Sequence, residues 1–89
     1  MPRYHFHLRV EDDVPDSEGQ ELPDKRTAIA QAAFYAREMA AESVRAGSLD
    51  LSHSISVSDE AGLTIHRVTF GEAVEIIPAN PKNNHDWQT

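Results

Sequence analysis

The sequence of 89 residues predicts an α+β domain of order β-α-β-β, in which one long helix packs on one face of a small three-stranded antiparallel or mixed sheet. Three observations predict this fold. Apolar and polar residues alternate over residues 3–10, an alanine-rich stretch with helical spacing occupies residues 24–46, and two further alternating runs flank a turn within residues 54–70. Alternation with a period of two is typical of half-buried strands, and a period of 3.6 is typical of amphipathic helices.

The first strand, residues 3–10, has one apolar face and one cationic face. The inward set consists of Tyr4, Phe6, Leu8 and Val10, and the opposite set of Arg3, His5, His7 and Arg9. One helix covers only one face of such a sheet, so the cationic face is expected to be open. Because the whole chain has a formal net charge of -7, this concentration of cations indicates a contact surface for an acidic partner.

The segment between the first strand and the helix is acidic and rich in turn-forming residues, which predicts a loop with a short extended piece at residues 20–22. Pro23 and Asp24 then favour the start of a helix. The helix is expected to run from Asp24 to Ala46 and to end at Gly47. Its expected apolar stripe is mostly alanine, which allows close approach to a sheet. The stripe consists of Ile29, Ala32, Ala33, Ala36, Ala40 and Val44.

Three larger side chains, Phe34, Tyr35 and Met39, lie on the flanks of this stripe. They make the apolar arc of the helix wider than one sheet contact requires. A loop, a tail or a partner has to cover the surplus, so these residues form a second candidate interaction patch.

Residues 54–70 predict a β-hairpin whose turn is a type I turn followed by Gly62 as a bulge. The expected pairs are Asp59 with Leu63, Val57 with Ile65 and Ser56 with His66. Arg67 then falls on the inner face, so a bulge or twist is expected near Arg67. Residues 72–77 fit either a helical turn or a short edge strand. Residues 78–89 are polar with one tryptophan, which predicts a flexible tail after a domain of residues 1–77.

Composition excludes several classes of protein. The chain has no cysteine, so disulfides and thiolate metal sites are excluded. It has no apolar run near the length of a membrane span and no export leader, which predicts a cytoplasmic protein without membrane contact. A sequence pI of about 5.0 argues against a general nucleic-acid binder.

The cationic face also suggests a metal site. His5 and His7 share one strand face, and His66 joins them if the first strand pairs beside residues 64–70. Three imidazoles form a familiar zinc set, but Arg3 and Arg9 would repel a dication. We therefore predict no metal and no cofactor, and keep a His-based metal-binding protein as an alternative.

Catalytic motifs do not reach a useful specificity in this sequence. Serines that alternate with apolar residues are typical of any exposed strand face, and the paired carboxylates lie in a loop. We predict a non-catalytic binding module without an identifiable small-molecule substrate. It is expected to self-associate, or to dock a protein partner, through the open sheet face or an edge strand.

Several short motifs together resemble a known family. They are Pro2-Arg3-Tyr4 with Phe6-His7, the acidic residues with Gly19 before an alanine-rich helix, and Asp59-Glu60 with Gly62 before Val68 and Phe70. The combination is similar to small bacterial proteins classed as a domain of unknown function, which typically open with Pro-Arg-Tyr. The resemblance covers about residues 2–70 and implies a fold and an order of elements, without a known activity.

A looser resemblance is to HicB-like antitoxin domains. These also place a strand, an acidic turn with glycine, and an alanine-rich helix led by Asp in that order. The resemblance implies an antitoxin or a nucleic-acid-associated regulator as an alternative function.

Overall fold

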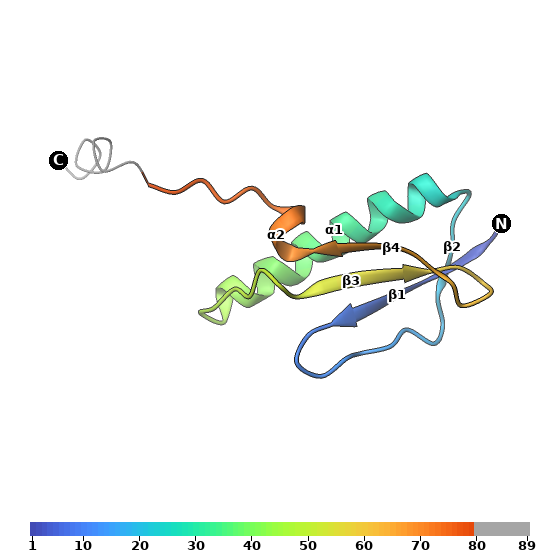
Figure 1. The fold of residues 1–89 in the computed structure, drawn as a ribbon, viewed down its shortest axis with the longest axis horizontal. Coiled ribbons are helices and arrows are strands. Elements are labelled where there is room, and N and C mark those ends of the chain that lie inside the picture. The colour runs from blue at the N-terminus through green and yellow to red at the C-terminus, as the bar shows by residue number, and fades with distance from the viewer. Residues whose placement is uncertain (80–89) are drawn as a thin grey trace.

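A computed structural model describes residues 1–79, in which one long helix lies on a sheet. The elements are β1 Arg3–Arg9, β2 Gln20–Glu21, α1 Lys25–Arg45, β3 Ser54–Ser58, β4 Thr64–Thr69 and α2 Phe70–Ala73. The strands form an antiparallel sheet in the order β2-β1-β3-β4, and α1 packs across one face of it (Figure 1). The predicted α+β class is confirmed. The sheet has four strands rather than three, because the short extended piece of the loop pairs with the beginning of β1.

The contact between α1 and the sheet is made by a line of alanines. Ala28, Ala32, Ala36 and Ala40 recur at every fourth position and are at most 4% exposed. Side chains spaced by four residues lie above one another on a helix, so this line presents a narrow, flat surface to the strands. Val44, which was expected in the stripe, is 60% exposed. Val44 is exposed because the helix is longer than the sheet that it covers. The 21-residue helix spans about 30 Å, whereas the strands beside it have only 5 to 7 residues.

Both predicted ends of the helix are confirmed. Asp24 is the N-cap, and its Oδ1 accepts a hydrogen bond of 2.8 Å from the backbone N–H of Thr27. At the other end Gly47 has a φ of +104° and donates its N–H to the carbonyl of Val44. The N–H of Ser48 bonds the carbonyl of Ser43, which completes a Schellman motif.

The hairpin between β3 and β4 has the predicted turn but a different register. The N–H of Asp59 donates to the carbonyl of Leu63, and Gly62 has a φ of +85°. The observed pairs are Ser58 with Thr64, Val57 with His66, and Ser56 with Arg67. The predicted partners of Val57 and Ser56 are therefore wrong. The predicted bulge is present. The extra residue is Ile65, two positions before Arg67, and its side chain packs against the core.

The end of the described chain is an extended arm. The ambiguous segment after β4 forms a helical turn at α2, whose capping box joins Thr69 and Glu72. Residues 74–79, the C-terminal arm, then run away from α2 and leave the body of the domain (Figure 1). Ile76 and Ile77 are 56% and 77% exposed. Most of the predicted tail, with Trp87, lies outside the described residues. Within residues 1–79, no helix has the length and hydropathy needed to cross a membrane.

Candidate interaction site

The arginines of the cationic face of β1 are partnered by the acidic loop that follows the strand. Arg3 lies 3.4 Å from the carboxylate of Glu21 and donates to the carbonyl of Glu18 at 2.9 Å. Arg9 forms an ion pair of 3.0 Å with Asp13. Both pairs are exposed and contribute little to stability. Much of the positive charge on this face is thus neutralised within the chain, and its contact with an acidic partner stays a prediction.

The two histidines of β1 hold the backbone of Asp16. His5 Nδ1 donates to the Asp16 carbonyl at 2.9 Å, and the Asp16 N–H donates to His7 Nδ1 at 3.0 Å. Because His7 Nδ1 accepts, the neutral ring carries its proton on Nε2, which donates to Ser58 Oγ at 3.0 Å. The two rings lie parallel, with centroids 6.2 Å apart. These histidines therefore bind the loop to the strand.

The third histidine does not join this pair. The bulge at Ile65 places His66 opposite Val57, whose side chain belongs to the core, and places Arg67 opposite Ser56 instead. Arg67 Nε donates to Ser54 Oγ at 3.1 Å. Within residues 1–79, no group of three histidine or carboxylate side chains is arranged to hold a metal ion.

The face of the sheet opposite α1 is less open than predicted. The serines of β3 on that face, Ser54, Ser56 and Ser58, are at most 5% exposed. They lie on a central strand, and the longer side chains of His7 and Arg67 on the neighbouring strands reach over them. The expectation of an open surface there is therefore wrong for the serines.

Asp16 closes the outer edge of β1. Its carboxylate accepts three backbone N–H bonds, from Phe6 at 3.1 Å, Gly19 at 3.0 Å and Glu18 at 3.2 Å. Partial burial raises the pKa of Asp16, but these N–H donors, helped by the charge of His5, outweigh it and hold the pKa below its ordinary value of 3.8. An anionic side chain thus takes the place of a neighbouring strand.

We expect Asp16→Asn to lower the free energy of unfolding by about 2 kcal/mol at pH 7, because hydrogen bonds to a charged group are lost. The folded-state pKa of Asp16 is depressed, so its stabilisation is present above the unfolded value of 3.8 and is lost as pH falls through the folded value. The difference between wild type and Asp16→Asn should therefore shrink from pH 5 towards pH 2. Urea unfolding at each pH measures it, and a constant difference would contradict the assignment.

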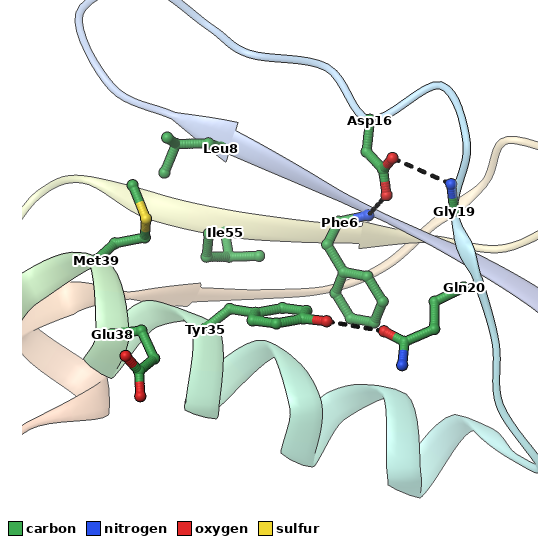
Figure 2. A pocket seen from close by; sticks show the side chains of 9 residues that line it. All are labelled: Phe6, Leu8, Asp16, Gly19, Gln20, Tyr35, Glu38, Met39 and Ile55. Atoms are coloured by element: carbon green, nitrogen blue, oxygen red, sulfur yellow. Dashed lines mark hydrogen bonds between the residues drawn. The ribbon is translucent and has the colours of Figure 1, made fainter.

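An apolar groove of about 310 Å³ lies between β1 and α1, beside the acidic loop that joins β1 to β2. Figure 2 shows the side chains that converge on it from the sheet and from the helix. The apolar lining is Phe6, Leu8, Ile55, Tyr35 and Met39, and Glu38 lies at the helical side. Asp16 and Gly19 of the loop and Gln20 of β2 complete the lining.

Tyr35 joins the two walls of the groove. Its ring meets Phe6 edge-on at 5.3 Å between centroids, and its hydroxyl donates to Gln20 Oε1 at 2.8 Å (Figure 2). Of the predicted patch, Tyr35 and Met39 line the groove, whereas Phe34 is 50% exposed beside it. The surplus apolar arc of the helix was the signal in the sequence for this groove. The sheet residues that complete the groove, Phe6, Leu8 and Ile55, have no signal in the sequence that separates them from other inward strand positions.

A family model matches residues 3–71, which include all four strands and α1. The chain belongs to the DUF6894 family, a domain of unknown function. The predicted resemblance to a domain of unknown function is thereby confirmed. The match to DUF6894 ends within α2, before the C-terminal arm. The chain has no detectable similarity to a curated protein or to a solved structure, and the resemblance to HicB-like antitoxin domains stays a prediction.

Proposed function

We propose that this protein is a non-catalytic interaction module that binds an apolar segment of a protein partner in the groove between β1 and α1. The observation that carries the proposal is the groove itself. Phe6, Leu8, Tyr35 and Met39 form its walls, and Met39 is 36% exposed there. An apolar cleft of this kind, at the boundary of two elements, is where binding sites are usually found.

The chemistry of the lining favours a protein segment over a small polar ligand. The Tyr35 hydroxyl bonds Gln20, and the Asp16 carboxylate bonds backbone N–H groups, so these polar atoms are already engaged. A small ligand needs several polar groups to orient it, whereas an apolar side chain needs only shape and burial. The volume of about 310 Å³ also lies at the lower end of the range for ligand pockets, roughly 300–1,000 Å³.

Both edges of the sheet have features that disfavour strand addition. The outer edge of β1 is occupied by β2, by the bonds between Leu8 and Val14, and by the Asp16 carboxylate. The outer edge of β4 has no strand neighbour within residues 1–79, but it carries the bulge at Ile65 and the exposed Arg67. Bulges and exposed charges protect a sheet edge from pairing. This supports side-chain docking in the groove as the mode of binding.

The proposal is tested by selecting peptides from a random displayed library on the wild-type protein and measuring their affinity by fluorescence polarisation. Met39→Glu places a carboxylate in the apolar groove, so it is expected to weaken binding at least tenfold, which corresponds to about 1.4 kcal/mol. Leu63→Glu is the matched control, because Leu63 is 66% exposed at the distant hairpin turn. Equal affinity of wild type and Met39→Glu would contradict the proposal.

A further inference from the structure

We propose that the groove of one copy receives the C-terminal arm of a second copy, with Ile77 as the inserted side chain. Each copy then gives one arm and accepts one, which forms a reciprocal dimer. The inference rests on the proposed function of the groove and names its occupant.

The arm has the properties of a segment that binds elsewhere. Among residues 1–79, its last backbone hydrogen bond joins the Val74 N–H to the Phe70 carbonyl. Val74 is extended, with φ -127° and ψ 148°, and every residue from 75 to 79 is exposed. Two adjacent isoleucines held away from the body expose apolar surface that water disfavours. A partner that covers these side chains would remove this surface from water.

The arm begins on the flank of α1 opposite the groove. Arg37 Nε donates to the Ala73 carbonyl at 2.8 Å, which fixes the end of α2 to α1. Arg37 is rotated by about 160° around the helix from Tyr35, because successive residues are about 100° apart. The sheet order agrees with this placement, since β1 forms the wall of the groove and β4, which leads into α2, lies two strands away.

The groove of its own copy is difficult for the arm to reach. Ile77 is four residues beyond Ala73, so its backbone reaches at most about 14 Å in a fully extended chain. A path halfway around a helix of about 10–12 Å diameter is about 16–19 Å long. While α2 stays attached through Arg37, these lengths favour the groove of another molecule over the groove of the same copy.

Charge opposes this association. Glu38 lies at the helical side of the groove, and Glu75 directly precedes the two isoleucines of the arm. The net charge of -7 on each copy opposes association, so the dimer is expected to tighten as salt screens this repulsion.

The chain has no cysteine, which allows a direct test by disulfide cross-linking. Met39→Cys and Ile77→Cys proteins are mixed and oxidised, and the mixed product is quantified by mass spectrometry. The expected result is at least ten times more mixed product than from Met39→Cys with Leu63→Cys, in which the second cysteine lies at the exposed hairpin turn. Light scattering on the wild type is expected to give the mass of two chains.

The proposal is overturned if the wild type stays monomeric and the mixed product does not exceed the control. It is also overturned if the double variant Met39→Cys/Ile77→Cys forms its disulfide within one chain. An Ile76→Ser/Ile77→Ser protein separates this result from the proposed function. This double variant should be monomeric and still bind the selected peptides. Loss of peptide binding in Met39→Glu alone supports the proposed function of the groove, whether or not the arm binds there.

Discussion

Replacing Phe70 with alanine is expected to lower the free energy of unfolding by about 3–5 kcal/mol, because a large side chain leaves a cavity that the core fills only in part. Phe70 is 1% exposed and meets the His53 ring edge-on at 5.7 Å between centroids. Its N–H also donates to the His53 carbonyl at 2.7 Å, which ties the end of β4 to β3. A domain of 89 residues has a total stability of about 4–13 kcal/mol, so a large fraction of it is lost.

Urea unfolding followed by circular dichroism measures this loss. Phe34→Ala is the matched control, because the same ring is removed from a position that is 50% exposed. Its effect is expected to stay within about 0.5 kcal/mol, as for most surface substitutions. Similar effects at the two positions would show that Phe70 is not the centre of this part of the core.

Gly19→Ala is expected to lower the free energy of unfolding by about 2–4 kcal/mol, the sum of a backbone cost near 1 kcal/mol and a packing cost of about 1–3 kcal/mol. Gly19 has a φ of +73°, and an added Cβ would lie 2.8 Å from the Tyr4 carbonyl oxygen and 2.9 Å from atoms of Arg3 and His5. The backbone of β1 is held in the sheet and cannot move aside. The loop would be forced away from the strand.

Gly47→Ala separates the two costs. Gly47 also has a positive φ, of +104°, but a Cβ there would meet no atom within 4 Å. Only the backbone cost of about 1 kcal/mol is expected. Equal decreases in the free energy of unfolding for the two variants, measured by thermal or urea unfolding, would show that the close approach of Gly19 to β1 adds no packing cost.

Features determined by neighbouring residues were predictable from the sequence. Asp24 and Gly47 mark the ends of α1 because a cap depends on the residue type and on the few backbone groups beside it. The hairpin turn at residues 59–63 was predictable for the same reason, since Gly62 alone adopts the required positive φ there. The alternation in residues 3–10 likewise fixed the two faces of β1.

Features determined by tertiary packing were not predictable. Ile65 and His66 both fit an alternating strand, and only the space beside the core decides that the extra residue is Ile65. The acidic loop contains several carboxylates, and nothing in their order distinguishes Asp16, which accepts backbone hydrogen bonds, from its exposed neighbours. The candidate site was half predictable, since the helix side of the groove appeared as a surplus of apolar residues.

The contacts of Asp16 have a consequence for the behaviour of the chain at acid pH. β1 carries aromatic and aliphatic residues on one side, and a bare edge on such a strand is a template for stacking copies into aggregates. A single carboxylate, supported by the rings of His5 and His7, covers the middle of that edge. Protonation of Asp16 therefore does more than weaken the fold. It weakens the acceptor of the Phe6 N–H and leaves this part of the edge available for pairing with another strand.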